Sequence, residues 1–475
     1  MAQPAPRPEP SGAKVIPIRE ASLYEAHKKI YARSVTGTFA TWRWAMVWFT
    51  QAIFYGLCWL EWNGRQAVLF DIVERKFYIF GLVFWPQDVF YLAILLIISA
   101  LALFLFTAVA GRLFCGYACP QTVYTEIFMW VEKRFEGDRV ARMKLDAAPW
   151  SAGKFARKAG KHAVWALIAL WTGFTFVGYF TPIETLAGAV LSWQLGPWET
   201  FWIFFYAFAT WGNAGFMREQ VCKYMCPYAR FQGVMFDPDT LIVTYDAERG
   251  EPRGARAKKL DHKAAGKGDC VDCGICVQVC PTGIDIRNGL QYECIGCSAC
   301  IDACDQVMDK MAYPRGLIRY STEHALAEHW GGRQIVRHIL RPRTLVYGAV
   351  LTAIVVAAAA GLTLRQPLKV DVLRDRATLA REVEGGLVEN VYRLQVMNLA
   401  EQPRRFVLAV TGLQGIRIAN EQIVEVPAAA TQSVSVRVRV EPDAGKRGAN
   451  PIHFEVRAVN HDEVFVREKA SFLLP

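Results

Sequence analysis

The chain has 475 residues, a net charge of +10 at pH 7 and 53% hydrophobic residues, with 15 Trp and 28 Phe. This length allows two or three domains, and the hydrophobic residues gather in separate blocks, a pattern that favours a membrane protein over a purely soluble one. Thirteen cysteines would suggest disulfides in a secreted protein, but none follows Cys304. We therefore expect the cysteine-rich part to face a reducing cytoplasm.

The N-terminal part predicts an arm followed by membrane spans. Residues 1–38 are rich in proline and charge and lack the apolar core of a signal peptide, so we expect a disordered cytoplasmic arm. Five apolar segments then approach the roughly 20 residues needed to cross a bilayer. They are residues 42–60, 89–109, 164–180, 198–216 and 345–364. Residues 39–236 should form a four-span membrane domain, and residues 344–366 a fifth transmembrane helix.

Loop charges predict the orientation of these spans. The loop between the second and third segments carries nine Lys and Arg residues from Lys133 to Lys161, whereas residues 181–197 carry none. Because Lys and Arg accumulate on the cytoplasmic side, we expect the N-terminus inside, residues 237–343 in the cytoplasm and the C-terminal tail outside. In the loop 61–88, the pair Asn63-Gly64 and the apolar runs 67–70 and 77–84 predict a hairpin against the membrane.

Four cysteines form a repeat close to the membrane. Cys115 and Cys119, and likewise Cys222 and Cys226, each belong to a Cys-x3-Cys-Pro motif just beyond an even-numbered span. Residues i and i+4 share a helix face, so each pair can offer two sulfurs to one ion, and the proline marks a helix break or start. Together they would form one four-thiolate site or two two-thiolate sites, suited to Cu(I), zinc or iron–sulfur chemistry. Cysteines that merely fill apolar space are the alternative.

Eight further cysteines form two identical runs of the pattern Cys-x2-Cys-x2-Cys-x3-Cys. This spacing is typical of two-cluster bacterial ferredoxins, in which the fourth cysteine of each run ligates the other cluster. A structural zinc site or disulfides fit poorly, because zinc usually takes two short pairs set well apart. We expect two 4Fe-4S clusters, one held by Cys270, Cys273, Cys276 and Cys304 and the other by Cys294, Cys297, Cys300 and Cys280.

Two other polar residues near the spans have open roles. Cys58 stands alone in an apolar span, where inert packing is the simplest interpretation. Glu126 lies close to the first motif and is a candidate for proton transfer, because ionisable groups at membrane depth are costly.

The C-terminal residues 367–475 change pattern. Apolar and polar residues alternate over 391–396, 406–410, 433–440, 452–459 and 464–472, which predicts short strands at the spacing of a β-sandwich. We expect an all-β, immunoglobulin-like domain without its common disulfide.

Taken together, these features resemble the FixG/CcoG/RdxA family of accessory proteins for the assembly of cbb3-type cytochrome oxidase. The resemblance rests on residues 62–88, both Cys-x3-Cys-Pro motifs, the two four-cysteine runs, the fifth span and the β-rich tail. It implies a polytopic α-helical protein of the bacterial inner membrane, with five spans, an inserted two-cluster ferredoxin domain and a periplasmic immunoglobulin-like domain.

The resemblance also implies an activity, the reduction of Cu(II) to Cu(I), with Cys115, Cys119, Cys222 and Cys226 as the copper site and copper as substrate or bound ion. Thiolates prefer Cu(I), which is compatible with this chemistry. The implied partners are the lipid bilayer, an unidentified electron donor, a copper chaperone or exporter, and oxidase assembly factors. We expect no nucleic-acid partner, and a homodimer stays open.

Two other functions stay open. The first is a quinol-linked electron relay, as in related membrane ferredoxins of periplasmic nitrate and nitrous-oxide respiration. The second is a non-catalytic assembly scaffold, in which the β-domain binds a partner and the clusters are structural.

Overall fold

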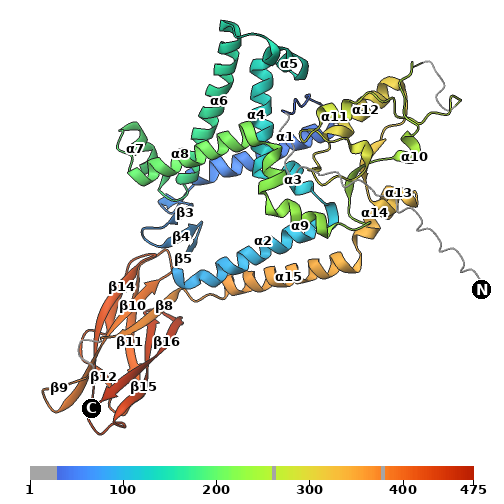
Figure 1. The fold of residues 1–475 in the computed structure, drawn as a ribbon. Coiled ribbons are helices and arrows are strands. Elements are labelled where there is room, and N and C mark those ends of the chain that lie inside the picture. Colours follow the sequence, from blue (N-terminus) through green and yellow to red (C-terminus); the bar gives the residue numbers. More distant parts are fainter. Residues whose placement is uncertain (1–28, 259–263, 376–379) are drawn as a thin grey trace, which may run out of the picture.

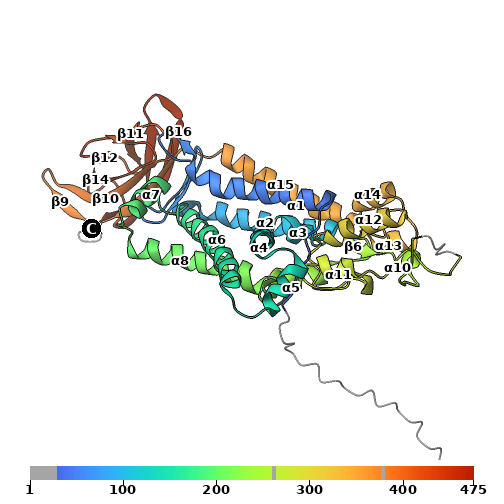
Figure 2. The ribbon, with the colours of Figure 1, turned by 90° about the horizontal axis from the view of Figure 1, so that it is seen from above.

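The structure is a computed structural model that describes residues 29–258, 264–375 and 380–475. Helices occupy the middle of the molecule, and two further domains lie at its opposite ends (Figure 1). A β-sandwich formed by the C-terminal residues lies at one end, and the cysteine-rich domain lies at the other. Figure 2 shows the same separation from a second direction.

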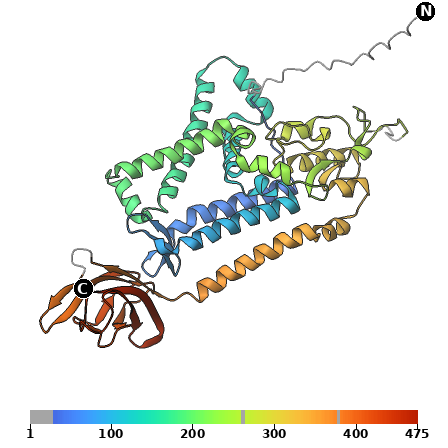
Figure 3. The ribbon, with the colours of Figure 1, turned by 60° about the horizontal axis from the view of Figure 1, so that its bottom comes forward.

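Five long helices form at the five predicted spans. They are α1 (Thr38–Gly56), α2 (Val89–Ala110), α6 (Ala152–Val177), α8 (Pro197–Gly212) and α15 (Pro342–Thr363). α2 and α15 run side by side from the β-sandwich to the cysteine-rich domain (Figure 3). In the described residues, the segments Pro86–Ala110 and Pro342–Thr363 are long and apolar enough to cross a membrane.

The other three helices stay predictions as membrane spans. α8 has 16 residues, fewer than the roughly 20 that a bilayer requires. α1 carries a buried arginine, Arg43, and α6 begins with a basic stretch that contains Lys154 and Lys161. These polar residues lower the mean hydropathy, although the outer faces are apolar: Trp48 of α1 is 72% exposed and Phe208 of α8 is 69% exposed.

The prediction that residues 1–38 form a disordered arm is wrong for the last part of this segment, which is held by hydrogen bonds. Residues 1–28 lie outside the described residues. Residues 29–37 are extended and hydrogen-bonded: Tyr31 donates to Asp146 (2.7 Å), and the hydroxyl of Ser34 donates to Asp138 (3.0 Å). Asp138 caps α5 (Arg139–Ala147), and Asp146 lies near its end. The arm is ordered here because α5 supplies acceptors that composition alone does not reveal.

The loop between α1 and α2 forms two small antiparallel sheets. The strands are β1 (Glu61–Trp62), β2 (Arg65–Gln66), β3 (Val68–Asp71), β4 (Lys76–Ile79) and β5 (Leu82–Phe84). Asn63 and Gly64 turn between β1 and β2 with φ values of 50° and 72°, which confirms the predicted hairpin turn. The second sheet contacts the C-terminal domain, because Val83 and Trp85 pack with Met397 and Leu399.

The C-terminal residues form the predicted all-β sandwich. One sheet contains β8 (Leu368–Arg374), β9 (Arg381–Val383), β10 (Leu387–Asn398), β12 (Arg417–Ile418) and β14 (Thr431–Val440). The other contains β11 (Arg404–Thr411), β13 (Ile423–Val426), β15 (Gly448–Ala458) and β16 (His461–Leu474). Buried aromatic residues from both sheets fill the core between them: Tyr392, Phe406, Phe454 and Phe472.

The cysteine-rich domain is a small unit in which a helix begins within each of the two cysteine runs. These helices are α11 (Ile275–Val279) and α12 (Ala299–Met311). β6 (Ile242–Tyr245) pairs antiparallel with β7 (Ile318–Ser321), so the chain before the runs is tied to the chain after them. α13 (Glu323–Ala327) and α14 (Gly332–Ile339) then lead into α15.

A buried ionic contact joins the β-sandwich to the start of α2. The side chain of Asp88 is 1% exposed and accepts hydrogen bonds from Arg365 and Lys369. Replacing Asp88 by Ala leaves both cations without this partner. Because both cations are partly exposed, we expect Asp88→Ala to lower the free energy of unfolding by about 3 kcal/mol, the lower end of the range for breaking a buried ion pair.

We therefore predict faster hydrogen–deuterium exchange in β3–β5 and β8 of Asp88→Ala. Glu384→Ala, at an exposed turn between β9 and β10, is the matched control and should leave exchange unchanged. Wild-type exchange in Asp88→Ala would show that this contact does not join the two parts.

Candidate metal centres

The structure brings the cysteines of the two runs together in crossed sets. One cavity is bordered by Cys270, Cys273, Cys276 and Cys304. A second is bordered by Cys280, Cys294, Cys297 and Cys300, with Cys276 at its edge. Each cavity is thus lined by three cysteines of one run and the fourth cysteine of the other.

The identical spacing of the runs gives identical local backbone. Asp272 and Gly296, each just before the second cysteine of a run, have positive φ values of 52° and 67°. Gly274 and Ser298, each just after it, have φ values of 63° and 60°, and α11 and α12 begin at the next residue. These alternating turns direct the first three cysteines of each run to one cavity, and the helix carries the fourth to the other.

These donor sets fit 4Fe-4S clusters, which are held by four cysteine thiolates. Among the described residues, no group of three or more His, Cys, Asp or Glu side chains is arranged to hold a single metal ion. Two thiolates on one tetrahedral ion lie about 4 Å apart, so the eight cysteines are not grouped for zinc. Burial raises the pKa of Cys297 to about 12, so loading this site must release protons.

The two Cys-x3-Cys-Pro motifs lie at helix breaks. α2 ends before Gly111, and the first motif spans the short helix α3 (Leu113–Tyr117) and the start of α4 (Pro120–Glu136). α8 continues into two π-helical turns, η3 (Asn213–Met217) and η4 (Val221–Met225), and α9 (Pro227–Met235) starts after the second motif. Both prolines occupy the first position of a new helix, where a missing N–H costs no hydrogen bond.

Hydrogen bonds hold the two motifs together. The side chain of Gln121 donates to the carbonyls of Asn213 (3.0 Å) and Arg218 (3.1 Å), which precede the second motif. Arg112 donates to the carbonyl of Ala229 (2.8 Å), and the thiol of Cys115 to Gln232 (3.5 Å), both in α9. The first motif and the residues beside it are therefore hydrogen-bonded to the chain on both sides of the second motif.

The four motif cysteines are brought close to one another. Every pair among Cys115, Cys119, Cys222 and Cys226 interacts electrostatically. Burial raises the pKa of Cys115 to about 11 and that of Cys222 to about 12, so both are protonated at neutral pH. Since no three side chains in the described residues form a single-ion site, a four-thiolate site is not ready-made.

The first motif contacts the cysteine-rich domain directly. A Cβ atom on Gly116 would lie 2.8 Å from the carbonyl atoms of Gly296 and 2.9 Å from the Cα of Cys297. Arg112 also donates to the carbonyl of Cys294 (3.3 Å). The first motif therefore lies beside the second cysteine cavity.

Cys58 and Glu126 lie in different surroundings. Cys58 is fully buried and packs with Val177, Ile183 and Leu186, as expected for an inert cysteine. Glu126 lines a separate cavity and lies 3.9 Å from Arg43.

Comparison with known proteins places the chain among bacterial relatives. It is 39% identical to nitrogen fixation protein FixG of Rhizobium meliloti over 454 residues, which cover 89% of this chain and 85% of FixG. It is 40% identical to protein RdxA of Cereibacter sphaeroides over 433 residues, covering 89% and 91% of the two chains. Protein RdxB of the same organism is 37% identical over 467 residues, covering 94% and 97%. The chain belongs to the FixG/RdxA family.

Three family models match separate segments of the chain and agree with its membership of the FixG/RdxA family. A 4Fe-4S dicluster domain matches residues 217–323, and a 4Fe-4S binding domain matches residues 92–137. The immunoglobulin-like fold at the C-terminus of FixG matches residues 358–475. The first two matches include all twelve motif cysteines and give the protein a redox role.

The close approach at Gly116 generates a prediction. Gly116→Ala should push the loop that contains Gly296 and Cys297 away and disturb the second cysteine cavity. We expect lower iron and acid-labile sulfide content, or a changed electron paramagnetic resonance spectrum of the reduced protein. Gly153→Ala is the control, because a Cβ there meets no atom within 4 Å. A normal spectrum and iron content in Gly116→Ala would contradict the tight contact.

Proposed function

We propose that this FixG/RdxA family member is an iron–sulfur oxidoreductase that reduces Cu(II) to Cu(I), for copper delivery during the assembly of cbb3-type cytochrome oxidase. The observation that carries the proposal is the contact of the first Cys-x3-Cys-Pro motif with the Gly296–Cys297 backbone. This contact supports the proposal because the proposed copper ligands of the first motif then lie beside the proposed cluster ligand Cys297.

The two crossed sets of cysteines are the proposed cluster ligands. Cys270, Cys273, Cys276 and Cys304 would hold one 4Fe-4S cluster, and Cys294, Cys297, Cys300 and Cys280 the other. Bound clusters supply electrons one at a time, which matches the single electron that converts Cu(II) to Cu(I).

The four motif cysteines are the proposed copper site. Thiolates bind Cu(I) more strongly than Cu(II), so binding there favours reduction of the ion. Because the thiols of Cys115 and Cys222 are protonated at neutral pH, copper binding must displace their protons. Arg112, whose charge lowers the pKa of both thiols, makes this deprotonation easier. Since no set of three ligands is preformed among the described residues, we expect copper to engage a pair first.

The molecule would span the inner membrane five times, with its N-terminus and clusters in the cytoplasm and the β-sandwich in the periplasm. Two observations support this arrangement. The β-sandwich and the cysteine-rich domain lie at opposite ends of α2 and α15 (Figure 3). The basic helix α5 is hydrogen-bonded to the N-terminal segment through Tyr31. That segment also contacts the cysteine-rich domain, because the backbone N–H of Arg33 donates to the carbonyl of Gln278 (2.8 Å). The reduced ion would pass to a copper chaperone or exporter.

An anaerobic single-turnover experiment tests the proposal. The clusters are reduced, excess reductant is removed, Cu(II) is added, and cluster reoxidation is compared with the Cu(I) captured by a chelator. We expect one Cu(I) per electron lost. Changing Cys115, Cys119, Cys222 and Cys226 to Ser should lower the yield at least about tenfold, because Ser is a poor ligand for Cu(I).

Cys58→Ala is the matched control, since this buried cysteine lies outside the motifs and should leave the yield unchanged. Equal copper reduction by wild type and the four-Ser variant would remove the assigned role of the motif cysteines. Failure of the wild type to reduce copper at all would overturn the function itself.

A further inference from the structure

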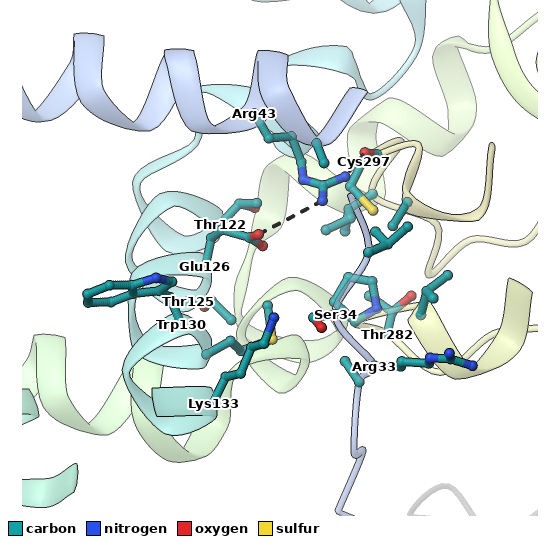
Figure 4. Close-up of a pocket in the computed structure, with 18 of the residues that line it drawn as sticks. Arg33, Ser34, Arg43, Thr122, Thr125, Glu126, Trp130, Lys133, Thr282 and Cys297 are labelled. Carbon is teal, nitrogen blue, oxygen red and sulfur yellow. Dashed lines mark hydrogen bonds and ion pairs between the residues drawn. The ribbon is translucent and has the colours of Figure 1, made fainter. Parts of the chain in front are cut away.

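A cavity of about 410 Å³ lies between the N-terminal segment, α1, α4 and the cysteine-rich domain. This volume falls in the range of small-molecule binding sites. Its wall includes Cys297, a proposed cluster ligand (Figure 4). It also includes Cys222, a proposed copper ligand. A molecule bound here would contact both redox sites.

The cavity has a largely apolar wall, and tryptophans line one side of it. Ile30, Val35, Met129 and Ile295 contribute to the wall. Trp44 and Trp130 also line it and contact each other edge to face, with ring centroids 6.4 Å apart. Trp130 is 55% exposed. Tryptophan is enriched where a membrane meets water, so an apolar ligand could enter this cavity from the bilayer.

The wall of the cavity has no excess of positive charge. The lining contains five basic side chains, among them Arg33, Arg43 and Lys133, and three acidic ones. The other two basic side chains, Arg142 and Arg218, pair with the buried carboxylate of Glu132 (2.5 and 3.0 Å), so the remaining positive and negative side chains are equal in number. This balance gives a divalent cation no net attraction and suits a neutral organic molecule.

One pair of side chains links the cavity to the redox site. Glu126 points toward Arg43 across the cavity (Figure 4), at 3.9 Å, and its side chain is 22% exposed. Arg43 in turn donates to the carbonyl of Cys297 (2.7 Å). A proton acceptor and the backbone of a proposed cluster ligand thus lie on the same side of the cavity.

We propose that this cavity binds a lipid-soluble quinol, which is the electron donor of the protein. The inference rests on the proposed function and names its missing donor. Oxidation of one quinol to quinone releases two electrons and two protons. The electrons would pass one at a time to the clusters that the two crossed cysteine sets would hold, and two Cu(II) would become two Cu(I). Glu126 accepts one proton, and the other leaves to water at the mouth of the cavity.

Binding tests the site without reference to turnover. The loaded full-length protein in lipid nanodiscs is titrated with decylubiquinone, and quenching of tryptophan fluorescence is followed. We expect saturable binding in the wild type and at least about tenfold weaker binding in Thr125→Phe, which fills the cavity. Thr363→Phe, at the exposed end of α15, should bind as the wild type does. Equal binding by the two variants, or no saturation, overturns the site.

Reduction by decylubiquinol tests the role of Glu126. Bleaching of the iron–sulfur absorbance is followed anaerobically, and full bleaching by dithionite checks that each variant is loaded. Glu126→Gln should lower the bleaching rate at saturating quinol at least about tenfold, as for loss of a general base, with quinone affinity within about twofold. A rate equal to that of the wild type overturns the proton-accepting role.

The two proposals fail in distinguishable ways. If quinol binds and bleaches the clusters but dithionite-reduced protein does not reduce Cu(II), the cavity assignment stands and the copper function is wrong. If dithionite-reduced protein reduces Cu(II) but decylubiquinone does not bind, the donor assignment is wrong and the copper function stands.

Discussion

The backbone contact between Gly116 and Gly296 is the constraint on which the candidate site depends. Any side chain at Gly116 would overlap the carbonyl of Gly296, and the φ of 67° at Gly296 itself favours glycine. Because neither residue has a Cβ, the first Cys-x3-Cys-Pro motif reaches the loop that carries Cys294 and Cys297. The cysteine-rich domain and the helices that carry the first motif therefore meet directly at this contact.

Buried charge fixes the second motif against the first. The side chain of Glu132 in α4 is 1% exposed and pairs with Arg142 (2.5 Å), Arg218 (3.0 Å) and Lys161 (3.6 Å). These partners come from α5, α6 and the turn before η4, so one carboxylate joins four parts of the chain. Buried ion pairs add little net stability compared with apolar packing, but an unpaired buried charge is costly. This network therefore selects one arrangement of α4 relative to the second motif.

Local patterns predicted much of this structure. The spacing of the eight cysteines is a property of neighbouring residues, and so is the alternation that predicted the strands around Tyr392 and Phe454. Long-range polar contacts were not predictable: Gln121 and Arg112 reach residues about a hundred positions away, and no motif marks them. The spans predicted at residues 42–60 and 164–180 stay predictions, because polar residues such as Arg43 in α1 and Lys161 in α6 lower the mean hydropathy of these helices.

The loop from Cys294 to Cys297 accepts hydrogen bonds from two arginines that lie in different parts of the helical region. Arg112, which lies beside the motif cysteines, donates to the carbonyl of Cys294, and Arg43, which lies beside the cavity, donates to that of Cys297. Net charge and hydrogen bonding set the potential of an iron–sulfur cluster, so Arg43 and Arg112 would favour the reduced, more negative state of a cluster held by Cys294 and Cys297. Beside the other cysteine set, Arg256 likewise donates to the carbonyl of Cys270 (3.3 Å), and Arg287 is paired with Asp272 and Asp285. The loop from Cys294 to Cys297 is therefore hydrogen-bonded both to the helix beside the cavity, through Arg43, and to the chain beside the motif cysteines, through Arg112.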